Sequence, residues 1–133
     1  MSTVTIDASA WPLVDITFEG VIADEDFEAY LDHVDAYPTG DVRYVMIVNA
    51  SRAYGITTQQ RKMQAAWMKR RHREIAANCL GIAFVMTSPI VRGMLTAILW
   101  LQPLPCPHYT CSTRAQAQSW CEGKLAEDAG REP

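Results

Sequence analysis

Apolar and polar residues follow one another along this chain in patterns that predict five strands. Alternation at 3–7 and 13–18 is typical of strands with one face buried, and the first is expected to be an antiparallel edge strand. The runs 44–48 and 80–86 are almost entirely apolar, which predicts strands covered on both faces. A short strand is expected around 109–111, after a proline-rich stretch.

Helical spacing of apolar residues predicts four helices between these strands. The first spans about 24–37, with acidic residues in its first turn, and the second about 58–77. Ser88 before a proline marks the start of a third helix, which continues to about Gln102. Thr113 is expected to cap the last helix.

Strands that alternate with helices predict an α/β domain, with a mixed, mostly parallel sheet of four to five strands and about four helices. The chain has 133 residues, enough to bury a core without disulfides or a structural metal. We therefore expect one domain over 1–133, with its core at about 3–125 and a flexible C-terminal tail at 126–133.

The net charge of −3 hides two halves of opposite sign. Residues 1–42 carry ten acids and no lysine or arginine, whereas residues 43–114 carry ten cations and one acid. A basic helix at 58–77 is a feature of nucleic-acid or anionic-lipid binding, but its cations are dispersed and the pI is near 5.5. We expect the two halves to fold against each other, with no nucleic-acid partner.

Several common functional motifs are absent from the sequence. The glycine spacing permits neither G-x-G-x-x-G nor a Walker loop, and there is no G-x-S-x-G or H-E-x-x-H. No uninterrupted apolar run reaches the ~18 residues of a membrane span. The four cysteines form no C-x-x-C pair and the N-terminus lacks a signal-peptide pattern, so we expect a cytoplasmic location.

Four segments resemble the SpoIIAA-like branch of the STAS superfamily, and together they extend over about residues 3–125. They are F-E-G-V-I-A-D-E-D-F-E-A-Y-L from Phe18, V-M-I-V-N-A-S from Val45, the helix-to-strand passage from Trp67 to Val85, and T-R-A-Q-A-Q-S-W from Thr113. The resemblance implies an α/β fold and a regulatory role similar to that of anti-sigma factor antagonists. It implies, more remotely, a likeness to lipid-binding domains of the Sec14 type.

In phosphorylated members of that family, a serine at a helix start accepts phosphate. Aligned without gaps, the family pattern places Asn49 and Ser51 on its first part and Thr58 in the position of the serine. Thr57 replaces the family's aspartate and Gln60 its glycine. Ser51, Thr57 and Thr58 are therefore candidates for a phosphoacceptor or a partner-binding loop, while the simpler interpretation makes Thr58 the helix N-cap.

The predicted helix at 89–102 is unusually apolar. A broad arc is expected to face the sheet, and it comprises Ile90, Val91, Met94, Leu95, Ile98 and Leu101. Four residues are then placed on the outer face, namely Arg92, Thr96, Leu99 and Trp100. The cover for the tryptophan is either the proline loop at 103–107, the segment after Leu125, or a second copy of the chain. We predict a homodimer with Leu99 and Trp100 at or beside the contact.

Cys106, His108 and Cys111 have side chains that bind zinc, but their spacing is not that of a zinc knuckle. We expect no metal and no cofactor there, and we interpret the cysteines as small buried hydrophobic residues. No catalytic residue is predicted.

Two classes of function fit these observations. The first is a non-enzymatic regulatory module that binds a protein partner through the mid-chain loop and adjacent helices. The alternative is a domain that binds a small apolar ligand or lipid in a pocket between the helix at 89–102 and the sheet, with an uncharacterised enzymatic activity.

Overall fold

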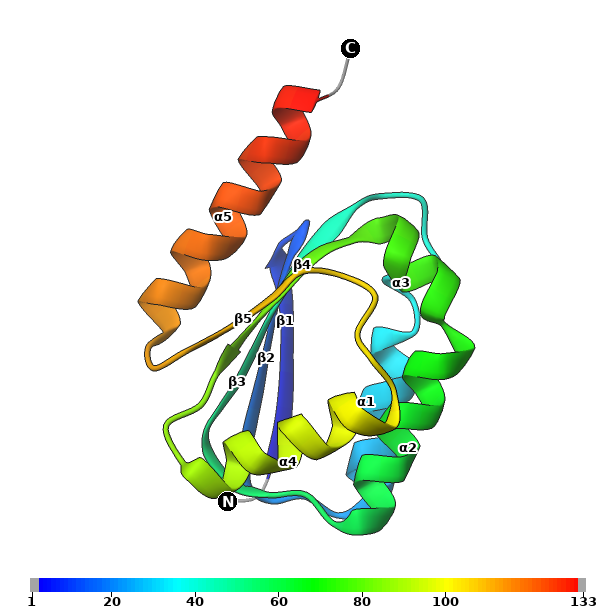
Figure 1. Cartoon of the computed structure of the whole chain (residues 1–133), viewed down its shortest axis with the longest axis vertical. Coiled ribbons are helices and arrows are strands. Elements are labelled where there is room, and N and C mark those ends of the chain that lie inside the picture. Colours follow the sequence, from blue (N-terminus) through cyan, green and yellow to red (C-terminus); the bar gives the residue numbers. More distant parts are fainter. Residues whose placement is uncertain (1–2, 132–133) are drawn as a thin grey trace.

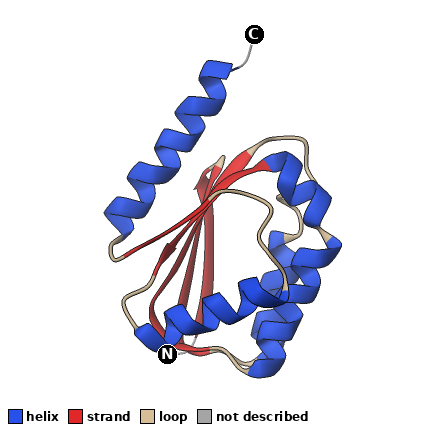
Figure 2. Ribbon diagram, viewed as in Figure 1, coloured by secondary structure: helices blue, strands red, loops and turns tan. Residues whose placement is uncertain are grey.

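The computed structural model describes residues 3–131, which form a five-stranded sheet with helices on both faces (Figures 1 and 2). The strand order is β1-β2-β3-β4-β5; β1 is antiparallel to β2, and the other neighbouring pairs are parallel. The strands are β1 (Thr3–Ala10), β2 (Leu13–Val21), β3 (Tyr44–Gly55), β4 (Cys79–Val85) and β5 (His108–Cys111). The predicted mixed, mostly parallel α/β sheet is confirmed.

The helices divide unequally between the two faces of the sheet. Figure 1 shows α5 alone on one side and the other four helices on the opposite side. They are α1 (Asp24–Val34), α2 (Thr58–Arg70), α3 (His72–Asn78), α4 (Pro89–Leu101) and α5 (Arg114–Arg131). The tail predicted from residue 126 is helical as far as Arg131, because α5 continues through it. Positions 132–133 lie outside the described residues.

The two central strands are buried on both faces, as their continuous apolar runs predicted. Side chains of β3 and β4 alternate between the two sides of the sheet, so each strand contributes to two cores. The α5 side contains Val45, Ile47, Ala83, Val85, Ala117 and Cys121, all buried. The opposite side contains a larger cluster in which β2, β3 and helices α1 to α4 take part.

β3 is longer than the predicted strand at 44–48 and occupies most of the mid-chain loop expected between that strand and the helix at 58. It continues to Gly55 and stays paired with β2 as far as the Val21–Gly55 pair. The extension contains polar residues and so carries no hydrophobic signal; pairing with the neighbouring strand holds it. Gly55 ends the strand with a φ of 117°, a backbone conformation that favours glycine.

The helix predicted over 58–77 is divided at Arg71 into α2 and α3, which is why five helices are described. Arg71 has φ −102° and ψ 15°, outside the helical region, and its guanidinium binds Asp35 after α1. The Nε–Oδ1 distance is 2.6 Å, and Trp67 Nε1 donates to the same oxygen at 2.8 Å. Arg71 also reaches Glu74 at 3.1 Å. Asp35 therefore fastens the end of α2 to the end of α1.

We predict that Asp35→Asn lowers the free energy of unfolding, and that the loss depends on pH. The hydrogen bond from Arg71, aided by that from Trp67, lowers the pKa of Asp35 below its ordinary value of 3.8. The stabilisation is complete above that ordinary value and disappears as the pH falls through the lowered pKa. Urea unfolding at several pH values should show the two proteins converging in acid. Asp32→Asn, at an exposed position of α1, is the control; an equal loss in both variants would contradict the prediction.

A second prediction concerns the close packing of α5 on β4. A Cβ atom on Gly81 would lie 2.6 Å from Cη2 of Trp120, whose ring is held by stacking on Tyr109. We expect Gly81→Ala to lower stability by about 1–3 kcal/mol, because the Trp120 ring, or the helix that carries it, must shift. Gly123→Ala in α5 meets no atom within 4 Å and is expected to raise stability by up to about 1 kcal/mol. Thermal unfolding of the pair measures both signs.

Candidate functional site

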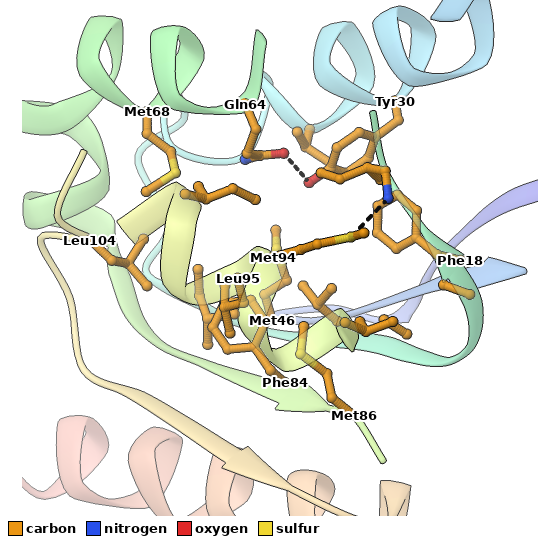
Figure 3. Close-up of a pocket in the computed structure, with 18 of the residues that line it drawn as sticks. Phe18, Tyr30, Met46, Gln64, Met68, Phe84, Met86, Met94, Leu95 and Leu104 are labelled. Carbon is orange, nitrogen blue, oxygen red and sulfur yellow. Dashed lines mark hydrogen bonds between the residues drawn. The ribbon is translucent and has the colours of Figure 1, made fainter. Parts of the chain in front are cut away.

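The helices on the larger side leave a cavity of about 120 Å³ between themselves and the sheet (Figure 3). Its walls come from β2, β3 and β4 and from α1, α2 and α4. The lining is almost entirely apolar, and four methionines contribute to it from different elements: Met46, Met68, Met86 and Met94. Methionine is flexible and polarisable, so such a lining adapts to the shape of what it encloses.

Two polar side chains face each other at one end of the cavity. The Tyr30 hydroxyl on α1 donates to Oε1 of Gln64 on α2 across 3.1 Å (Figure 3). Burial raises the pKa of Tyr30 above its ordinary value, so the hydroxyl stays protonated as a donor. A phenol and a primary amide at an apolar wall are groups that can form hydrogen bonds with a polar atom placed in the cavity.

The backbone at the end of β3 meets the cavity through Met94. The Ile56 N–H donates to Met94 Sδ at 3.3 Å, the second contact drawn in Figure 3. Gly55 lies so close to this side chain that a Cβ atom there would fall 2.6 Å from Met94 Cε. A thioether sulfur is a weak hydrogen-bond acceptor. An oxygen atom in the cavity would be a stronger acceptor for the Ile56 N–H than Met94 Sδ is.

The start of α2 differs from the prediction by one residue. Thr57, not Thr58, is the N-cap: its hydroxyl accepts from the Gln60 N–H at 3.0 Å, and Gln60 Oε1 accepts from the Thr57 N–H at 3.2 Å. This reciprocal pair is a capping box, and the spacing Thr57-x-x-Gln60 is its sequence signature. Thr58 is the first helical residue and accepts a hydrogen bond from Arg61.

Gln60, which the family comparison marked only as a departure from glycine, is a central structural residue. It is 1% exposed, and its Nε2 donates to Ile22 O at 2.8 Å and to Asp24 Oδ1 at 2.9 Å. It therefore joins α2 to the connection between β2 and α1. The capping-box spacing was the signal that sequence reasoning missed.

The candidate phosphoacceptors lie on separate elements. Ser51 is on β3, where its N–H and Oγ donate to Asn49 Oδ1, and the threonines are at the start of α2. No hydrogen bond within the described residues joins Ser51 to either threonine. Their role as phosphoacceptors stays a prediction.

The outer face of α4 differs from the prediction at several positions. Leu99 was expected on the outside but packs against the core, whereas Ile90 and Leu101, expected inside, are 69% and 60% exposed. The helix buries the narrower stripe of Val91 and Ile98, which leaves the side chains of Ile90 and Leu101 pointing away from the core. Two of the predicted interface residues have hydrogen-bond partners close by in the sequence. The Arg92 guanidinium donates to Met86 O, just before α4, and the Thr96 hydroxyl donates to Arg92 O.

Trp100 is on the outer face, as predicted, and is 85% exposed. Two parts of the chain were considered as segments that bury the Trp100 ring, the proline loop at 103–107 and the segment after Leu125. Among the described residues this expectation is wrong, because neither the proline loop nor α5 buries the ring. Figure 1 shows α5 on the far side of the sheet from α4.

The three residues with zinc-binding side chains have separate partners. Cys106 lies against Cys79, His108 stacks edge-on to Phe84, and the Cys111 thiol points at the carbonyls of Phe84 and Thr113. Across the described chain, no three histidine, cysteine or acidic side chains gather as a metal site.

None of the helices that the structure describes is both long and apolar enough to span a bilayer.

Comparison with known proteins identifies the fold. No family model and no curated protein sequence matches the chain. Among solved structures, it is similar to an uncharacterized DUF3478-family protein with a SpoIIAA-like fold from Shewanella loihica PV-4, with a TM-score of 0.66, 11% identity, and coverage of 91% of this chain and 95% of the other. The protein has a SpoIIAA-like fold, as the resemblance implied.

Two anti-sigma factor antagonists share this architecture. The unphosphorylated form of SpoIIAA matches with a TM-score of 0.63 and 18% identity, over 91% of this chain and 97% of that one. An antagonist from Mycobacterium paratuberculosis matches with a TM-score of 0.54 and 14% identity, over 92% and 95% of the respective chains. These matches show the fold that the three proteins share.

Proposed function

We propose that this protein is a non-enzymatic regulatory module that binds a small apolar ligand between the sheet and α4. The apolar cavity carries this proposal. An empty cavity of this size costs about 3 kcal/mol at about 24 cal/mol per Å³, and a ligand that fills it recovers part of that cost. The likeness to anti-sigma factor antagonists supports the regulatory part.

The size and chemistry of the cavity define the ligand class. Its volume of about 120 Å³ is close to that of an apolar cavity known to bind benzene, about 150 Å³, and below that of drug-sized pockets. A substituted benzene or a short acyl chain therefore fits. One hydroxyl or carbonyl on the ligand pairs with the Tyr30–Gln64 end or with the Ile56 N–H.

We predict that p-cresol and toluene bind in the cavity, and that p-cresol binds more tightly. When p-cresol or toluene is titrated into protein with ¹³C-labelled methionine methyl groups, the methyl NMR signals of the four lining methionines should shift. Met63, which packs on the core but does not line the cavity, serves as an internal reference. Native mass spectrometry of the freshly purified protein tests whether a cellular ligand occupies the same place.

Two alanine-to-leucine substitutions distinguish filling of the cavity from the general effect of introducing a larger side chain. Ala53→Leu places a larger side chain in the lining and should weaken p-cresol binding at least about tenfold, a loss of about 1.4 kcal/mol. Ala97→Leu makes the same change on α4 at a position outside the lining and should bind like the wild type. Equal binding by both variants, or no methionine shift in the wild type, would refute the proposal.

Protein binding through the outer face of α4 is the second candidate, and the exposure of Trp100 favours it. We propose a second copy of this chain as the occupant, because an isologous contact buries the exposed tryptophan of both subunits at once. Burying about 150–250 Å² of ring surface contributes roughly 4–6 kcal/mol before entropy costs.

The expected result is a dimer of the 14.9 kDa chain that Trp100→Glu converts to a monomer. Light scattering coupled to size exclusion measures the mass of each variant. Tyr54→Glu, at a 77% exposed aromatic residue on β3, is the matched control and should stay dimeric. A wild-type monomer at all concentrations would exclude self-association.

A further inference from the structure

Two of the four cysteines face each other across the larger core. Cys79 begins β4, and Cys106 lies in the proline loop between α4 and β5; their Sγ atoms are 3.6 Å apart, although 27 positions separate them in the chain. A disulfide bond length is about 2.05 Å, so the sulfurs need to approach by about 1.5 Å. Closing this gap requires side-chain rotation and a small movement of the loop.

The surroundings of the two thiols give them different roles. Cys79 is buried, and Cys106 is half-buried at the edge of the core. The hydrogen bond from the Cys106 thiol lowers the pKa of Cys79, although burial opposes this, and the Cys79 thiol in turn points at the Gly81 carbonyl oxygen at 3.7 Å. Donation to Cys79 raises the pKa of Cys106. Within the pair, Cys106 is therefore the donor and Cys79 the acceptor.

The other two cysteines lack this arrangement. The Cys121 thiol points at the carbonyl oxygen of Met46, and Cys111 points at those of Phe84 and Thr113. Both belong to the cluster on the α5 side of the sheet. Burial raises the pKa of Cys121 to about 12, which keeps it an unreactive thiol near neutral pH.

We propose that Cys79 and Cys106 form a reversible disulfide when the protein meets a hydroperoxide. The Cys79 thiolate attacks one oxygen of hydrogen peroxide; an S–O bond forms, the O–O bond breaks, and the hydroxide that leaves takes up the proton that Cys79 had released, giving water. Cys106 then attacks the sulfenic sulfur, the S–S bond forms, and the departing hydroxide takes the Cys106 proton as water. Both sulfurs are oxidised and the peroxide is reduced to water; a dithiol then reduces the disulfide back to two thiols and is itself oxidised.

The disulfide affects the loop that closes the cavity. Leu104 lies two residues before Cys106 and lines the cavity, so a bond to β4 fixes this part of the wall. This consequence rests on the proposed function, whereas the disulfide chemistry does not. We expect oxidation to slow hydrogen exchange across 102–108 and to slow the release of p-cresol.

The experiment uses the reduced full-length protein and hydrogen peroxide in small molar excess, without ligand. Intact mass should fall by two hydrogen atoms per chain, alkylation should label two thiols instead of four, and peptide mapping should recover Cys79 joined to Cys106. Dithiothreitol should restore four labelled thiols. Because mapping is done on the wild type, this test does not depend on any variant folding.

Variants check the assignment of the pair. Cys106→Ser should abolish the mass loss and leave Cys79 as a sulfenic acid that a dimedone probe labels, whereas Cys111→Ala should form the disulfide as the wild type does. A different pairing, a link between chains, or four free thiols after peroxide treatment would overturn the proposal. p-Cresol binding that persists in the reduced protein, without any disulfide, would leave the proposed function intact.

Discussion

The burial of β3 and β4 on both faces is the constraint on which the rest of this structure depends. Strands with apolar side chains on both sides require cover on both sides, and the chain supplies it asymmetrically. A single helix packs tightly on one face, where Gly81 admits the ring of Trp120. Four helices share the other face, and their larger span encloses the cavity. The candidate ligand site is thus a result of how unevenly the two faces are covered.

Local patterns predicted the elements whose stability comes from their own residues. The apolar runs located both central strands, and Ser88 with the following proline located the start of α4. The extension of β3 was missed because its polar residues are held by pairing with β2, a partner distant in sequence. The division at Arg71 was missed for a similar reason, since Asp35, which binds it, lies 36 positions earlier in the chain.

The candidate site was predictable in place but not in detail. A pocket between the third predicted helix and the sheet was one of the two alternatives, and the cavity lies there. The volume of the cavity depends on how closely the helices pack on the sheet and on one another. The spacing of apolar residues in the sequence does not determine this packing distance. Leu99 illustrates the limit: an ideal helical wheel placed it outside, but the helix is rotated onto Val91 and Ile98. The Cys79–Cys106 contact is likewise a product of tertiary folding.

The ends of α2 and α4 are held by different sets of hydrogen bonds. Gln60 holds the first turn of α2 to the β2–α1 connection, and Asp35 holds its end, so both ends are anchored to α1 and its flanks. α4 is bonded at its beginning, through Ser88 and Arg92, and ends in the proline loop. The exposed ring of Trp100 lies near the C-terminal end of α4, so its fluorescence would report a movement of that end.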